Sequence, residues 1–133
     1  MSDQHTLIAI VDDEEPVRRA LGRLLESAGM TVEKYSSGRD FLVAAKHSRP
    51  ACVLLDLHMP DMSGFEVLAA LQEEKAEIPV VVITGYHSRD AKARVQAQGA
   101  ATLLQKPIND RLLLSAIEDA IQPPEEPNFE AKS

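Results

Sequence analysis

Unbroken runs of apolar residues constrain the fold of this 133-residue chain most strongly. Such runs occupy residues 7–11, 53–55 and 78–83. A strand without polar residues must be covered on both faces, which is typical of parallel sheets in α/β proteins. Residues 31–35 alternate in character, as in an edge strand, and residues 101–105 form a fifth candidate strand.

A helical segment is expected after each strand. The five helices run from Pro16 to Gly29, from Ser36 to the break at 48–50, from Ser63 onward, over 89–98, and from Asn109 to Ile121. Strands that alternate with helices through short, right-handed connections predict an α/β fold with a doubly wound, five-stranded parallel sheet. The usual strand order for a sheet of this size is 2-1-3-4-5, the flavodoxin-like arrangement.

Three helices carry more detailed expectations. Ser63 and Glu66 have the spacing of a capping box, and Phe65, Leu68 and Leu71 should be buried on the helix that follows. The helix over 89–98 has Val95 as its single large apolar residue and should be the least firmly held. In the last helix, the residues expected to face inward are Leu112, Leu113, Ala116, Ile117, Ala120 and Ile121.

Length and composition indicate one folded domain over residues 6–121, with an extension at 1–5 and a mobile, Pro- and Glu-rich tail at 122–133. A net charge of -7 argues against general binding to nucleic acid or an anionic membrane, although a local basic patch stays open. No apolar run could span a bilayer and the amino terminus lacks a signal-peptide pattern, so a cytoplasmic location is expected. Cys52 should be a small buried apolar residue.

Polar residues follow four of the strands. They are Asp12 and Asp13 after the first, Asp56 at the end of the third, Thr84 at the end of the fourth and Lys106 after the fifth. Parallel strands end at one edge of a sheet, so these side chains should meet there. Clustered carboxylates repel unless they protonate or hold a cation, and oxygen ligands with room for water suit Mg²⁺ or Mn²⁺.

A cation, a hydroxyl, an ammonium group and one free carboxylate suit phosphoryl transfer, in which a carboxylate can accept the phosphoryl group. Each residue alone has an ordinary structural explanation. Asp12 and Asp13 could cap a helix, Thr84 could be a routine strand residue and Lys106 a solvated charge. Their joint placement at four strand ends favours the functional interpretation.

The motifs at these strand ends resemble those of the receiver domain of bacterial two-component response regulators. They are the acidic pair Asp12-Asp13, the pattern Asp-x-x-Met-Pro-x-Met-x-Gly over 56–64, Thr84-Gly85, and Lys106-Pro107. The resemblance covers about residues 6 to 121.

This resemblance implies a role for each residue of the site. Asp56 would accept the phosphoryl group, Asp13 would bind the metal ion directly, and Asp12 would bind it through water. The backbone carbonyl of His58 would be a further metal ligand.

The phosphoryl group would be contacted from two other strand ends. Thr84 would donate a hydrogen bond to it, with the Gly85 backbone N–H nearby, and Lys106 would pair with it. The family also implies a cis peptide bond between Lys106 and Pro107.

The family further implies a phosphorelay cycle. A phosphohistidine on a sensor histidine kinase or phosphotransfer protein would supply the phosphoryl group, which water later removes. Phosphorylation would alter the face formed by residues 88–98, 101–105 and 109–121. That face would act on a downstream protein or an output domain that is missing here, or support a phosphorylation-dependent homodimer.

Three positions modify this expectation. Receivers usually carry Tyr or Phe three residues before the lysine, whereas this chain has Leu103, so an aromatic rotamer switch is absent. The residues two after the acceptor and two after the threonine are His58 and Tyr86, both bulky. We expect them to obstruct in-line water, so that the phosphorylated state lasts longer than with small residues; a surface role for both is the alternative.

Two other function classes stay open. An aspartate-nucleophile phosphatase would need a second Asp two residues after the nucleophile, where this chain has His58. A degenerate receiver that binds a partner without phosphate is disfavoured by the intact acidic pair, Thr84 and Lys106, while Leu103 keeps it open. The leading interpretation is a phosphoacceptor regulator that is not an enzyme beyond assisting its own phosphorylation and dephosphorylation.

Overall fold

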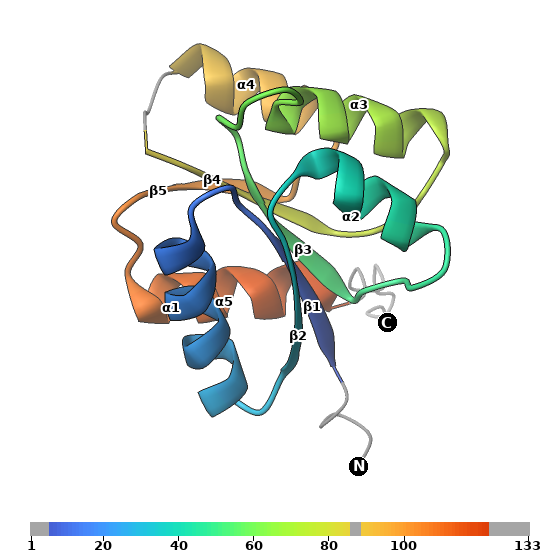
Figure 1. The fold of residues 1–133 in the computed structure, drawn as a ribbon. Coiled ribbons are helices and arrows are strands. Elements are labelled where there is room, and N and C mark those ends of the chain that lie inside the picture. Colours follow the sequence, from blue (N-terminus) through green and yellow to red (C-terminus); the bar gives the residue numbers. More distant parts are fainter. Residues whose placement is uncertain (1–5, 86–88, 123–133) are drawn as a thin grey trace, which may run out of the picture.

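The structure is a computed structural model that describes residues 6–85 and 89–122. Over these residues a parallel five-stranded sheet has the order β2-β1-β3-β4-β5, which confirms the predicted fold (Figure 1). The strands are β1 (Leu7–Val11), β2 (Thr31–Tyr35), β3 (Cys52–Asp56), β4 (Val80–Thr84) and β5 (Thr102–Gln105). The helices are α1 (Glu15–Ser27), α2 (Gly38–Ala45), α3 (Gly64–Glu73), α4 (Arg89–Ala97) and α5 (Asp110–Ile121).

Helices cover both faces of the sheet. In Figure 1, α2, α3 and α4 lie on one side and α1 and α5 on the other. Alternate strand residues enter two separate apolar clusters: Val53 and Leu55 of β3 face the first layer, whereas Cys52 and Leu54 face the second. Burial raises the pKa of the Cys52 thiol to about 12, so this cysteine is a neutral core residue, as expected.

Strand and helix boundaries differ slightly from the sequence prediction. β4 begins at Val80, two residues later than expected, because Pro79 has no N–H for the sheet ladder. Its carbonyl still accepts from Val53 N at 2.9 Å. The expected extension at 1–5, a helix cap at Ser88 and nearly all of the expected tail at 122–133 lie outside the described residues.

Two predicted core positions need correction. Leu112 was expected to face inward, but it is 61% exposed, whereas its neighbour Leu113 is fully buried. Phe65 is only partly buried, and the guanidinium of Arg94 covers its ring at 3.8 Å. Phe65 therefore packs at the edge of the first apolar cluster, and a cation–π contact between α3 and α4 covers the rest of its ring.

Helix α4 is shallowly anchored, as its alanine-rich sequence predicts. Val95 is its one buried residue. Besides the Arg94–Phe65 contact, the side-chain amide of Gln98 donates to the Phe65 carbonyl oxygen at 3.2 Å. Among the described residues, these two polar contacts therefore add to the apolar packing of Val95.

The start of α3 is fixed by the predicted capping box. Ser63 Oγ accepts from the Glu66 backbone N–H at 3.3 Å, and Glu66 Oε1 accepts from the Ser63 backbone N–H at 2.9 Å. We expect Ser63→Ala to lower the free energy of unfolding by about 1 kcal/mol, because the Glu66 backbone N–H at the helix end loses its acceptor, Ser63 Oγ. Urea unfolding would measure this loss. Ser115→Ala, at an exposed position inside α5, is the matched control and should cause no loss. Equal stability of the two variants would contradict the prediction.

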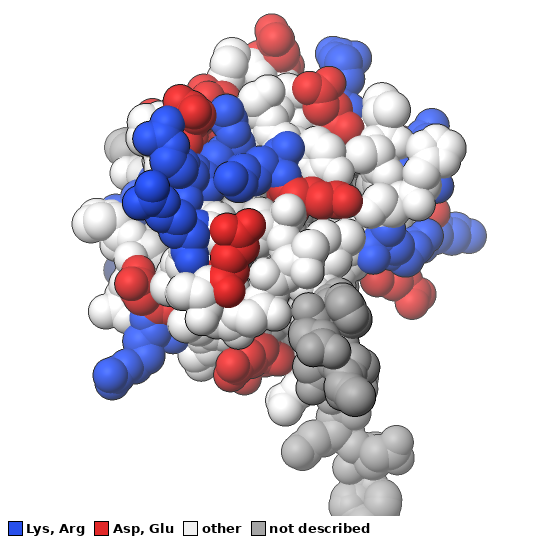
Figure 2. Space-filling model, turned by 60° about the horizontal axis from the view of Figure 1, so that its bottom comes forward, with Lys and Arg blue, Asp and Glu red and all other residues white. Residues whose placement is uncertain are grey.

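Surface charge is unevenly distributed. Figure 2 shows Lys and Arg side chains gathered on one part of the face in view. Arg18, Arg19 and Lys34 come together around a shallow pocket that Glu15 and Ser36 also line. A local basic patch thus exists on a chain whose net charge is -7. No helix in the described ranges is both long and apolar enough to cross a membrane.

Candidate functional site

Three carboxylates meet at the carboxyl edge of the sheet. Asp12, Asp13 and Asp56 each offer an oxygen, and these oxygens all lie within 4.8 Å of one another. The pairing of Val11 with Leu55 between β1 and β3 brings the residues that follow, Asp12 and Asp56, side by side. Asp12 is fully buried and Asp56 is 3% exposed, whereas Asp13 is exposed to solvent.

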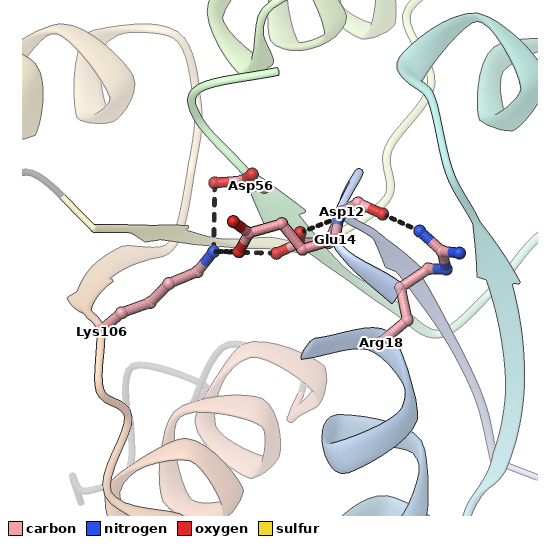
Figure 3. A network of polar contacts seen from close by, with 5 residues as sticks. All are labelled: Asp12, Glu14, Arg18, Asp56 and Lys106. Carbon is pink, nitrogen blue, oxygen red and sulfur yellow. Dashed lines mark hydrogen bonds and ion pairs between the residues drawn. The ribbon is translucent and has the colours of Figure 1, made fainter. Parts of the chain in front are cut away.

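The position of Asp12 is fixed by its own turn and by helix α1. Its Oδ1 accepts from the Glu14 backbone N–H at 2.9 Å, and its main-chain carbonyl accepts from Arg18 Nη1 at 2.6 Å (Figure 3). These bonds direct the other carboxylate oxygen, Oδ2, toward the end of β5.

Lys106 meets the carboxylates from the end of β5. Its Nζ lies 3.1 Å from Asp12 Oδ2, 3.6 Å from Glu14 Oε1 and 3.8 Å from Asp56 Oδ1 (Figure 3). Burial alone would lower the pKa of Lys106, but its hydrogen bond to Asp12 and the surrounding negative charges raise it above the ordinary value. Lys106 is therefore charged near neutral pH.

Asp56 has an unusual acidity. Burial, followed by the charge of Asp12, raises the pKa of Asp56 to about 7, although Lys106 and a hydrogen bond from the His58 backbone N–H oppose this rise. Near neutral pH, a bound cation would therefore compete with a proton for this carboxylate.

An open hollow lies over Asp56. Its lining residues, which define what we call the acidic hollow, are Asp13, Glu14, Asp56, His58, Gly85 and Lys106. Its volume is about 360 Å³. Thr84 is fully buried at the end of β4, and its carbonyl accepts from the Lys106 backbone N–H at 2.7 Å. Adding a Cβ to Gly85 would meet nothing closer than Lys106 Cδ at 4.0 Å, so the hollow stays accessible on that side.

The structure brings most predicted site residues together, but not all of them. Leu103 lies apart from the acidic hollow, in the apolar cluster that also contains Val95 of α4. Tyr86 lies outside the described residues. The bond between Lys106 and Pro107 is cis, as the resemblance implies.

Two residues at the site had no predicted role there. They are Glu14 and Arg18, which contact Lys106 and the Asp12 carbonyl respectively. Residues 12–15 are four consecutive acids, whereas the receiver motif needs only the pair Asp12-Asp13. The two additional acids were the sequence signal that could have pointed to Glu14.

The oxygens at this edge fit a hard divalent cation. Asp12 Oδ2 is buried, and the contact the structure gives it is the ion pair with Lys106 Nζ at 3.1 Å. A carboxylate oxygen can accept from more than one direction, so one contact with Lys106 leaves room for a further cation. Carboxylate oxygens with open space beside them are the donors that Mg²⁺ prefers.

Comparisons with known proteins agree with the site geometry. The transcriptional regulatory protein FixJ of Rhizobium meliloti is 40% identical over 113 residues, which cover 85% of this chain and 55% of FixJ. The response regulator protein TodT of Pseudomonas putida is 36% identical over 122 residues, covering 92% of this chain and 54% of TodT. The chain thus spans about half the length of these relatives.

Solved structures show the same fold. A crystal structure entitled FixJ-N superposes with a TM-score of 0.83 at 39% identity, covering 91% of this chain and 95% of that one. The structure of the Vibrio cholerae chemotaxis protein CheY4 superposes with a TM-score of 0.81 at 30% identity, covering 87% of this chain and 98% of the CheY4 chain. A family model described as the response regulator receiver domain matches residues 8–118. The chain therefore belongs to the response regulator receiver domains of two-component systems.

Proposed function

We propose that this chain is a phosphorylation switch whose Asp56 accepts a phosphoryl group from a phosphohistidine on a sensor histidine kinase or phosphotransfer protein. The observation that supports this most directly is the position of Asp56. It is a nearly buried carboxylate at a strand end, with Asp12 and Asp13 on one side and Lys106 on the other. An oxygen of Asp56 would attack phosphorus, the bond from phosphorus to the histidine nitrogen would break, and an acyl phosphate would form.

The surrounding residues would stabilise the transferred group. Lys106, 3.8 Å from Asp56 Oδ1, would pair with a phosphoryl oxygen, and the Thr84 hydroxyl and Gly85 backbone N–H would donate hydrogen bonds to others. Asp12, Asp13, Asp56 and the His58 carbonyl would hold Mg²⁺ or Mn²⁺, which supplies positive charge to offset the phosphoryl oxygens.

The output would pass through α4. Leu103 of β5 packs in the same apolar cluster as Val95, the one buried residue of α4. Because leucine has no aromatic ring to turn inward, we propose that movement of Thr84 shifts α4 as a unit, helped by its shallow burial. The altered face, α4-β5-α5, would bind a downstream protein, an output domain or a second copy, and Leu112 is exposed there.

The lifetime of the phosphorylated state would depend on side chains around the hollow. His58 is exposed and lines it, so its imidazole is placed to obstruct an attacking water molecule. A role for Tyr86 rests on its sequence position alone. Autodephosphorylation would be the limit of the chain's own catalysis.

Phosphoryl labelling tests this function. With Mg²⁺ and acetyl phosphate, the wild-type chain should gain the mass of one phosphoryl group, and fragmentation should place that group on Asp56 rather than Asp12 or Asp13. Chelation of Mg²⁺ by EDTA should suppress the gain, since the carboxylates would then repel the donor. A phosphoryl group on another residue, or no gain at all, would refute the proposal.

A further inference from the structure

Glu14 occupies a helix-capping position without capping the helix. It is the N-cap residue of α1, yet its side chain makes no capping hydrogen bond. Ser, Thr, Asp and Asn cap helices well because their short side chains reach the backbone N–H groups of the first turn. The longer side chain of Glu14 reaches Lys106 instead, with Oε1 3.6 Å from Nζ (Figure 3).

The Glu14 carboxylate also stands at the entrance of the acidic hollow. It lines the hollow with Asp56, but its side chain is 61% exposed, whereas that of Asp56 is 5% exposed. Its backbone N–H is held by Asp12 Oδ1 at 2.9 Å, which keeps its main chain at the rim. A phosphodonor in the acidic hollow therefore lies beside a fourth negative charge, in addition to those of Asp12, Asp13 and Asp56.

We propose that Glu14 is a specificity-determining residue that disfavours small anionic phosphodonors and holds Lys106 until a phosphoryl group arrives. This inference rests on the proposed phosphoacceptor function. Its charge repels a free dianion such as acetyl phosphate, and its contact with Lys106 reduces the share of that ammonium group available to the donor. A donor carried by a docked protein has binding contacts that offset the same repulsion. Glu14 thereby favours phosphorylation by a protein partner.

The neighbouring residue offers a matched control. Glu15 is also exposed, pairs with Arg19 at 2.9 Å, and is absent from the lining of the acidic hollow. Glu14→Gln and Glu15→Gln remove the same charge one residue apart. Only Glu14→Gln removes it from the path of the donor.

The experiment measures the labelling rates of the wild type and both variants at saturating Mg²⁺. Two donors are used: acetyl phosphate, and phosphoramidate, which carries about one negative charge fewer than acetyl phosphate. Calorimetry first gives the Mg²⁺ affinity of each protein, which Glu14→Gln should weaken by no more than about 3-fold. With acetyl phosphate at low ionic strength, Glu14→Gln should raise the rate about 3- to 10-fold. Its gain with phosphoramidate should be smaller, and both gains should shrink at high salt. Glu15→Gln should change each rate by less than about 2-fold.

The outcomes separate this inference from the proposed function. If the wild type is labelled at Asp56 but the two variants label at equal rates, or Glu14→Gln is the slower, the inference is overturned alone. Equal gains with both donors, insensitive to salt, would also overturn it, because a purely structural effect does not follow donor charge. No label on the wild type would overturn the proposed function and this inference with it.

Discussion

Asp56→Asn is expected to abolish phosphoryl labelling and, at the same time, to stabilise the metal-free protein. The amide nitrogen and oxygen cannot replace a carboxylate as the attacking group, so labelling should be lost completely. Stability should rise because the substitution removes a nearly buried negative charge that lies beside Asp12 and Asp13. Lys106 keeps partners in this variant, since Asp12 Oδ2 lies 3.1 Å and Glu14 Oε1 3.6 Å from its Nζ.

The stability effect should depend on pH in a defined direction. The pKa of Asp56 is about 7 in the folded protein against an ordinary value of 3.8, so the folded state binds this proton more tightly than the unfolded state does. The contribution of Asp56 to stability is therefore fully present below about pH 4 and is lost as the pH rises through 7. A pKa shift of this size corresponds to a change of at most about 4 kcal/mol in the free energy of unfolding.

Urea unfolding in EDTA at pH 5.5 and pH 8 would measure this dependence. At pH 8, Asp56→Asn should exceed the wild type in free energy of unfolding by about 2–4 kcal/mol. The difference should be smaller at pH 5.5. Asp119→Asn, which changes an exposed carboxylate on α5, should leave the pH dependence of the wild type intact. A variant no more stable than the wild type at pH 8 would show that Asp56 ionises normally in the metal-free fold.

The sheet and the acidic cluster could be predicted because two general rules are strong. Apolar runs such as 53–55 have few alternatives to a strand covered on both faces. Parallel strands end at one edge, so residues as far apart in sequence as Asp12 and Lys106 had to lie at the same edge once the strand order was known. Neither prediction required knowledge of a side-chain conformation.

The predictions that failed, or could not be made, depend on side-chain direction. The start of α5 contains three consecutive leucines, Leu112, Leu113 and Leu114, so the apolar pattern there does not determine which of them faces the sheet. Glu14 could equally have pointed into solvent, and its reach toward Lys106 follows from the turn that Asp12 stabilises. Such choices depend on tertiary contacts.

Gly64→Ala is expected to be the most destabilising small substitution that we identify in this chain. A Cβ at Gly64 would lie 2.7 Å from the Asp56 carbonyl oxygen and 2.8 Å from Leu57 Cα. Both are backbone atoms, and the Gly64 backbone N–H donates to the Leu57 carbonyl at 2.8 Å, so the first turn of α3 is held against the end of β3. Relief of the contact requires α3 and the strand end to separate, which should lower the free energy of unfolding by about 3–5 kcal/mol.

The same displacement would move Asp56 from its partners, so phosphoryl labelling of folded Gly64→Ala protein should also slow. Gly22→Ala is the matched control, since its Cβ would lie 2.8 Å from Lys34 Cε, the far end of a flexible and exposed side chain. Lys34 can move away, and alanine favours the interior of α1, so this variant should unfold with unchanged or slightly higher free energy. Urea unfolding of both variants compares two steric clashes of nearly equal distance. In Gly64→Ala the new Cβ meets backbone atoms, whereas in Gly22→Ala it meets a side-chain atom that can move. If the two glycines tolerate alanine equally well, close contact between α3 and β3 does not fix the position of Asp56.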